Sequence, residues 1–148
     1  LVSAAERDGV RLIAVTLNAP DDWRDHTAML DYGFAQFRSV PLCRTGDAAF
    51  SLPVTGGIAD AVPLNYAEDC TVALPIGHRP VSVTVEAPRF LFAPVEADTV
   101  RGEAVYACDL NGDGKAEEIA RVPLVTGGSA TRKPAEQRGF FGWLKDIF

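Results

Sequence analysis

The oxygen-bearing side chains Asp109, Asn111 and Asp113 stand at alternate positions, and Gly114 follows them. This D-x-N-x-D-G spacing begins many calcium-binding loops, because Ca²⁺ prefers carboxylate and amide oxygens. An EF-hand also needs a bidentate Glu at the twelfth position of the loop, where this chain has Ala120. A β-turn rich in Asn, Asp and Gly explains the same residues without a metal. We favour the turn and keep a calcium-dependent binding module as an alternative.

The side chains that could act as nucleophiles or bases form no recognisable active site. No serine is followed by Lys three positions on, and none lies in a Gly-x-Ser-x-Gly motif. The two histidines, His26 and His78, lie in separate contexts, so neither suggests a Ser/His/Asp or Cys/His arrangement. His26 is predicted to pack or to cap on a helix. We expect no catalytic residue and no cofactor within this chain.

Large apolar side chains recur at helical spacing in the last stretch of the chain, and basic residues lie off that face. This pattern predicts a short amphipathic helix that lies in the plane of a membrane and binds it weakly and reversibly. The polar linker TGGSATRKP, over residues 126–134, favours membrane binding over docking on its own domain, although self-docking and a protein partner stay open. The residues predicted to contact the membrane are Phe140, Phe141, Trp143, Leu144, Lys145, Ile147 and Phe148.

The 148 residues have the composition of a globular protein, with 47% hydrophobic residues and a net charge of −6. The acidic balance argues against a nucleic-acid partner. No run of about 18 apolar residues occurs, which argues against a membrane-spanning helix. The three cysteines, Cys43, Cys70 and Cys108, lack CxxC spacing, which argues against zinc. Three buried thiols, or one disulfide and one free thiol, are both compatible with this pattern.

The first elements are expected to be a β-hairpin and a helix. Asp8-Gly9 lies between two apolar runs, which indicates a tight turn, and residues 10–17 are predicted to be a central, well-buried strand. Asp21 or Asp22 can cap the helix that follows.

This helix is predicted to run to about Arg38 with one apolar face. Gly33 lies on or beside that face, so we predict a close packing partner there, because Gly otherwise costs helix stability by roughly 1 kcal/mol. The spacing places on this face Trp23, Thr27, Leu30, Phe34 and Phe37.

From residue 41 to about residue 126 the chain consists of short β-type runs between Gly, Pro, Asn and Asp. Their number and spacing predict a small antiparallel β-sandwich or barrel, and the apolar residues of 81–86 alternate with polar ones. The clearest predicted strands cover residues 71–74, 81–86, 100–108 and 119–125.

The first segment, LVSAAERDGVRLIAVTLNAPDDWRDHTAMLDYGF, resembles the end of the penicillin-binding domain of D-alanyl-D-alanine carboxypeptidases, the low-molecular-mass penicillin-binding proteins of serine peptidase type. The hairpin, the D-H-x-x-x-L-D-Y-G-F helix, the small β-domain and the final amphipathic helix match this family in order. The resemblance is specific in residues 1–37, moderate in residues 139–148 (GFFGWLKDIF) and architectural in between.

The resemblance implies a mainly β chain of three parts. Residues 1–38 would be the end of a penicillin-binding α/β domain, residues 39–126 a β-sandwich domain, and residues 127–148 a linker and membrane-anchor helix. The family trims the terminal D-Ala from peptidoglycan pentapeptides with Ser-x-x-Lys, Ser-x-Asn and Lys-Thr-Gly motifs, none of which occurs here. The implied partners are a missing N-terminal catalytic half, peptidoglycan and a membrane surface outside the cytoplasm. Arg24 is the nearest match to a family residue that helps bind the substrate carboxylate, but Asp22 falls where Arg is expected.

Two further expectations follow. The chain begins at Leu1 without Met or a signal peptide, so it is either processed or a piece of something longer. If the catalytic half is absent, the sheet edge and the apolar helix face of residues 1–38 lose their cover, and this segment should be loose, re-packed or oligomer-forming. A rival function is a stand-alone, non-catalytic β-sandwich adaptor that tethers a partner to the membrane.

Overall fold

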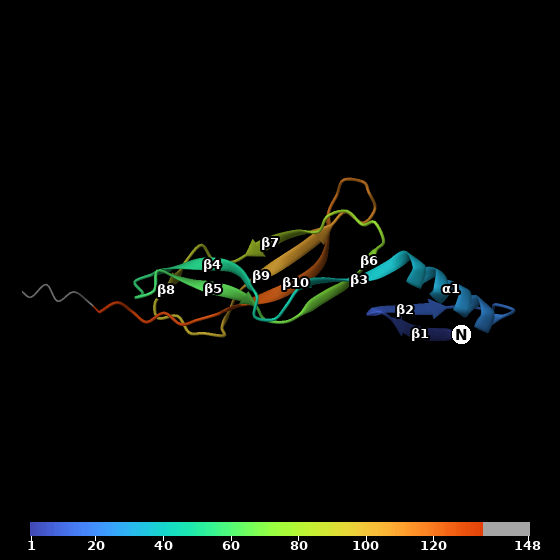
Figure 1. Ribbon diagram of the computed structural model, residues 1–148, viewed down its shortest axis with the longest axis horizontal. Helices are drawn as coiled ribbons and strands as arrows, with labels where there is room; N and C mark the ends of the chain where they lie inside the picture. Colours follow the sequence, from blue (N-terminus) through green and yellow to red (C-terminus); the bar gives the residue numbers. More distant parts are fainter. Residues whose placement is uncertain (135–148) are drawn as a thin grey trace, which may run out of the picture.

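A computed structural model describes residues 1–134 (Figure 1). The molecule is elongated, with a hairpin and helix at one end and a β-domain that extends to the other end. The fold is mainly β, as predicted, and its strands form three sheets. Among the described residues no helix has both the length and the apolar character needed to cross a membrane.

The N-terminal part is a two-stranded antiparallel hairpin, β1 (Val2–Arg7) and β2 (Val10–Val15), followed by the helix α1 (Asp22–Gln36). Asp8 and Gly9 both have positive φ, of 51° and 75°, which is the backbone that a two-residue hairpin turn needs. Asp21 is the N-cap of α1, and its carboxylate accepts the backbone N–H of Arg24. The predicted turn and helix start are therefore confirmed.

The helix packs on one face of the hairpin, and Gly33 is the point of closest approach. A Cβ atom at Gly33 would lie 2.6 Å from Cδ1 of Leu12, so the predicted close packing partner is this leucine. The prediction of the apolar face is partly wrong. Leu30 does lie on the side of α1 that meets the hairpin, but His26 lies there as well, and Trp23 is exposed to solvent. Close approach at Gly33 fixes this rotation of the helix.

Two predictions about residues 10–38 are corrected by the structure. The strand predicted to be central and well buried is β2, which has only β1 beside it, and its Ile13 is 69% exposed. The helix ends at Gln36, and Phe37 already has the extended conformation of β3 (Phe37–Cys43). Phe37 pairs with Pro75 across the sheet, so strand pairing overrides the helical spacing at this position.

The β-domain contains one six-stranded sheet in the order β7-β9-β10-β5-β4-β8 and a two-stranded sheet of β3 and β6. Neighbouring strands are antiparallel except β4 and β8, which are parallel. The predicted strands are confirmed, although the predicted alternation of β7 is not, because Val83 is exposed. The remaining strands are β4 (Ala48–Thr55), β5 (Ala61–Tyr66), β6 (Cys70–Pro75), β7 (Ser82–Glu86), β8 (Leu91–Phe92), β9 (Val100–Cys108) and β10 (Glu117–Thr126).

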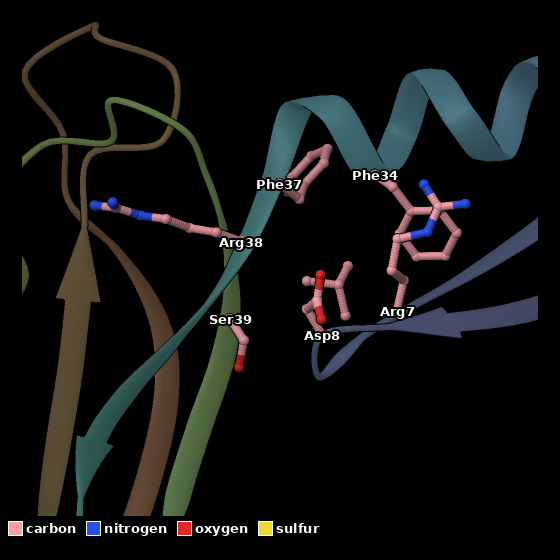
Figure 2. Close-up of a pocket in the computed structure, with 7 residues that line it drawn as sticks. Arg7, Asp8, Phe34, Phe37, Arg38 and Ser39 are labelled. Atoms are coloured by element: carbon pink, nitrogen blue, oxygen red, sulfur yellow. The ribbon is translucent and has the colours of Figure 1, made fainter.

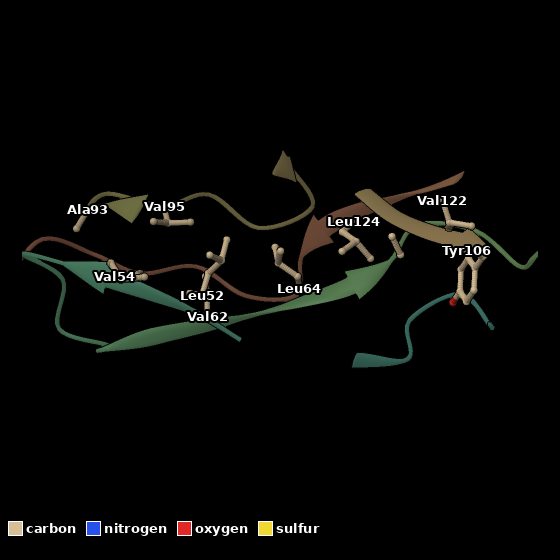
Figure 3. Close-up of a cluster of buried hydrophobic side chains, with 11 residues drawn as sticks. Leu52, Val54, Val62, Leu64, Ala93, Val95, Tyr106, Val122 and Leu124 are labelled. Atoms are coloured by element: carbon tan, nitrogen blue, oxygen red, sulfur yellow. The ribbon is translucent and has the colours of Figure 1, made fainter. Parts of the chain in front are cut away.

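The hydrophobic core of the β-domain lies between the strands of the six-stranded sheet and the segments that fold over it (Figure 3). Leu52, Leu64 and Leu124, from β4, β5 and β10, are fully buried and form its centre. Burial of such side chains is the main stabilising contribution to a domain of this size. Val95 and Ala130, which lie outside the named strands, close the core and hydrogen-bond to each other through their backbones.

The segment after β10 differs from the free linker that its composition predicts. The backbone N–H of Lys133 donates to the carbonyl of Gly56, and that of Ile58 donates to Thr131. Residues 127–133 therefore run along the β-domain. The domain boundary predicted between residues 38 and 39 falls inside the strand β3. The division of the chain into domains stays a prediction.

Candidate functional site

His26 connects the three elements of the N-terminal part and is buried, with 3% of its surface exposed. Its Nδ1 lies against the Ser3 hydroxyl in β1, and its Nε2 lies 2.9 Å from the Thr16 hydroxyl after β2. Thr16 donates its only hydroxyl proton to the Asp22 carboxylate, so Nε2 of His26 must be the donor toward Thr16. Both ring nitrogens therefore have hydrogen-bond partners within the N-terminal part, which agrees with the packing role predicted for His26.

The opposite face of the hairpin is apolar and exposed. Val2 pairs with Val15, and Ala4 pairs with Ile13, so these four side chains share one face. The helix covers the other face, and all four of these residues are exposed. We call Val2, Ala4, Ile13 and Val15 the open sheet face. Exposed apolar faces are typical of surfaces that pack against another layer or partner.

A small cleft lies where the hairpin and the end of α1 meet the β3–β6 sheet, and it encloses about 220 Å³ (Figure 2). Arg7 stacks over the ring of Phe34, 4.6 Å from its centre, and pairs with Asp31 at 3.1 Å. Arg38 points away from Arg7 in Figure 2, so the two guanidinium groups do not converge on one ligand. Sequence patterns did not indicate this cleft, because its walls come from separate elements. It lacks a nucleophile paired with a base, and we assign it no reaction.

Arg24, the predicted substrate-binding residue, lies in the first turn of α1 and is exposed. The cleft lined by Arg7 and Arg38 lies at the other end of this helix, so the structure does not bring Arg24 together with these two residues. Its predicted role therefore gains no partner among the described residues and stays a prediction.

The Asp109–Asp113 segment forms a tight loop between β9 and β10. Asp109 accepts the backbone N–H groups of Gly112 and Gly114 and lies 3.5 Å from the Arg79 guanidinium. Asp113 accepts the N–H of Lys115. Within residues 1–134 no group of three His, Cys, Asp or Glu side chains is placed to hold a metal. The carboxylates of Asp109 and Asp113 therefore accept backbone N–H groups of the loop itself, as the turn interpretation predicts. The alternative of a calcium site with Asn111 gains no support from the described residues.

Cys43 and Cys70 are directly opposite each other in β3 and β6, which local sequence could not reveal. Both are half-buried, and only Cys108 is buried, so the interpretation as three buried thiols was wrong. The thiol of the buried Cys108 donates a hydrogen bond to the carbonyl of Arg79, with its Sγ 3.2 Å from that oxygen. Residues opposite each other in antiparallel strands have Cα atoms about 4.5–5.5 Å apart, which is the separation that a disulfide spans.

We expect oxidised glutathione to join Cys43 and Cys70 in the folded chain and to leave Cys108 reduced. Each disulfide formed passes the two protons and two electrons of the cysteine thiols to one oxidised glutathione, which leaves as two molecules of reduced glutathione. Burial, together with the nearby Cys43 and Glu68, raises the pKa of the Cys70 thiol. Fewer Cys70 thiolates are then present at neutral pH, so the cross-link should form faster as the pH rises from about 7 to 9.

Peptide mass mapping without reduction checks this cross-link. Cys108→Ser should form it at an unchanged rate, and Cys70→Ser should not form it. A cross-link that includes Cys108 in the folded monomer would refute the pairing.

The residues predicted to contact a membrane, Phe140 to Phe148, lie outside the described part of the chain. Their role stays a prediction.

No protein-family model matches the sequence, and no curated protein sequence matches it. Solved structures do match the fold. Penicillin-binding protein 5 from Haemophilus influenzae superposes with a TM-score of 0.68 and 25% sequence identity, over 89% of this chain and 38% of that chain. A peptidoglycan synthesis regulatory factor, PBP3, from Streptococcus pneumoniae gives a TM-score of 0.67 and 24% identity, over 87% and 38% of the two chains.

The D-alanyl-D-alanine carboxypeptidase DacD from Francisella tularensis also matches, with a TM-score of 0.56 and 23% identity, over 90% of this chain and 33% of that chain. The chain thus spans between 33% and 38% of the length of these proteins. These matches confirm the resemblance predicted from the sequence: in its mainly β fold the chain is similar to low-molecular-mass penicillin-binding proteins and D-alanyl-D-alanine carboxypeptidases, over a share of their length consistent with a C-terminal portion.

Proposed function

We propose that this chain is the C-terminal part of a D-Ala-D-Ala carboxypeptidase that trims the terminal D-Ala from peptidoglycan pentapeptides outside the cytoplasm. The chain is not catalytic by itself. Its hairpin and helix complete the catalytic domain, and its β-domain holds that domain away from the membrane and toward the peptidoglycan. The observation that carries the proposal is the open sheet face of the hairpin, together with the fold shared with penicillin-binding proteins.

The open sheet face is what a missing catalytic half would cover. A two-stranded hairpin is marginally stable in water, and it needs further strands or a packed layer on its apolar face. One layer is α1, which covers the side of Leu12 and Ala14. The other side, with Ile13 and Val15, remains for strands or helices supplied by the rest of the protein. The Ser-x-x-Lys, Ser-x-Asn and Lys-Thr-Gly motifs would come from that same part, because this chain has none of them.

The β-domain fits a positioning role by its shape. Its sheet is long and thin, and it separates the hairpin–helix end from the end where residue 134 leaves the described structure (Figure 1). If residues 140–148 bind a membrane, the catalytic end is held about one domain length from the lipid surface.

The test is to label membranes of the source cells with fluorescent penicillin and to probe the same gel with an antibody against this chain. Serine-type carboxypeptidases form a stable acyl-enzyme with penicillin, so the label stays on the protein. We expect the antibody to mark a labelled band well above 15.8 kDa. An unlabelled band at 15.8 kDa alone would contradict the proposal and would favour the stand-alone adaptor.

The open sheet face is then tested in the protein that carries the label. We expect Ile13→Lys to lower penicillin labelling severalfold, because it places a charge in a face that must pack. The matched control is Val83→Lys, which alters an exposed strand residue of the β-domain and should leave labelling unchanged. Equal labelling of the two variants would show that the open sheet face does not meet the catalytic half.

A further inference from the structure

Three segments far apart in the sequence form the end of the β-domain opposite the hairpin (Figure 1). They are residues 55–60, 89–93 and 130–133, and we call them the tip. Thr55 pairs with Phe92, Ile58 donates its N–H to Thr131 at 2.8 Å, and Lys133 donates to Gly56 at 2.8 Å. These backbone hydrogen bonds hold the three segments in one fixed arrangement.

The tip presents large apolar side chains to solvent. Ile58 is 62% exposed, Phe92 is 70% exposed and Phe90 is 46% exposed. The rings of Phe90 and Phe92 meet edge to face, with their centres 5.1 Å apart. The β-domain core does not need these residues, because its own cluster is closed by Val54, Ala93 and other buried side chains.

The tip is also basic, on a chain whose net charge is −6. It carries Arg89, Arg132 and Lys133, all exposed, and one acidic residue, Asp60. Asp60 pairs with Lys133 at 3.5 Å, but both side chains are largely in water, so this pair is weak. The tip therefore combines exposed aromatic rings with a local positive charge.

We propose that the tip binds the surface of an anionic phospholipid bilayer, with Phe90, Phe92 and Ile58 at the acyl boundary and the basic side chains at the headgroups. Aromatic rings favour this interface, and basic residues are attracted to anionic lipids. The occupant is a lipid surface rather than a second copy of the tip, because two positive tips would repel each other. This inference deepens the proposed membrane attachment but rests only on described residues, and its test separates the two.

The test is co-sedimentation of the full chain with vesicles of phosphatidylglycerol and phosphatidylcholine, compared with vesicles of phosphatidylcholine alone. We expect Phe92→Ser to lower the partition coefficient about tenfold, because an exposed Phe loses its place at the acyl boundary. Arg132→Gln should lower it about fivefold on anionic vesicles only. The matched control is Ile76→Ser at the other end of the β-domain, where Ile76 is 61% exposed, close to the 62% of Ile58; this variant should not change the partition coefficient.

A Phe141→Ser, Trp143→Ser variant separates the tip from the predicted terminal helix. If the terminal helix does not bind lipid but the tip does, this variant partitions normally and Phe92→Ser still loses binding. As a second measurement, Phe92→Trp in a Trp23→Phe, Trp143→Phe background should be quenched by brominated phosphatidylcholine in mixed anionic vesicles. Unchanged partitioning of Phe92→Ser, or no quenching at position 92, would overturn the proposal. Binding of the tip to a protein instead of vesicles would overturn it as well.

Discussion

Replacing Leu124 with Ala is expected to lower the free energy of unfolding of the β-domain by about 2–5 kcal/mol, because it empties the centre of the core. Leu124 is fully buried, and its strand β10 pairs with both β5 and β9 at this position, so the neighbouring backbone cannot move in to fill the space. Domains of this kind are stable by roughly 5–15 kcal/mol in total, so the loss is a large fraction. Urea unfolding followed by far-UV circular dichroism measures it.

The matched control is Leu17→Ala. Leu17 is 90% exposed, and surface substitutions of this kind usually change stability by less than about 0.5 kcal/mol. If both variants unfold at the same urea concentration, Leu124 does not belong to the cooperative core of the β-domain.

Replacing His26 with Ala is expected to open the hairpin and helix without unfolding the β-domain. The substitution removes the common partner of the Ser3 and Thr16 hydroxyls and leaves a cavity beneath α1. Unsatisfied buried polar groups cost about 1–3 kcal/mol each. Few other buried contacts hold the hairpin, so its free energy of local opening is small and the loss of these hydrogen bonds is a large part of it.

Hydrogen exchange of backbone amides measures this effect. Amides of α1 and β2 should exchange faster in His26→Ala, while amides of β9 and β10 keep their protection. Tyr32→Ala, at an exposed position of the same helix, is the control and should change neither group. Equal loss of protection in β10 would mean that the two parts unfold as one unit, which would also contradict the expectation that residues 1–38 are loose on their own.

The local structure of the chain followed from short-range rules. Asp8-Gly9 supplies the positive φ values that a tight hairpin turn requires, and Asp21 supplies the carboxylate that caps the helix. Both effects act over a few residues, so sequence alone predicted them. Gly33 was recognised as a close-approach position for the same reason, since only a packing partner justifies Gly inside a helix.

Long-range pairing decided what these rules could not. Phe37 has helical spacing from Phe34, yet it lies in β3, opposite Pro75. The helix ends there because the chain turns into the β3–β6 sheet, where the backbone N–H of Ile76 donates to the carbonyl of Gln36. The pairing of Cys43 with Cys70 and the gathering of Ile58, Phe92 and Arg132 at the tip depend on strand register between distant segments. Register is set by tertiary packing, and no local spacing records it.

The sequence by itself therefore determined the mainly β class, the hairpin and helix of the first 36 residues, and the resemblance to penicillin-binding carboxypeptidases. Only the tertiary structure decided which surfaces are covered. An apolar run such as residues 10–15 indicates a strand that is able to be buried, but its burial requires a second layer, and here Ile13 and Val15 face solvent. Exposure is a property of the assembled neighbours rather than of the segment, because the same apolar side chains are core or interaction surface according to what packs on them.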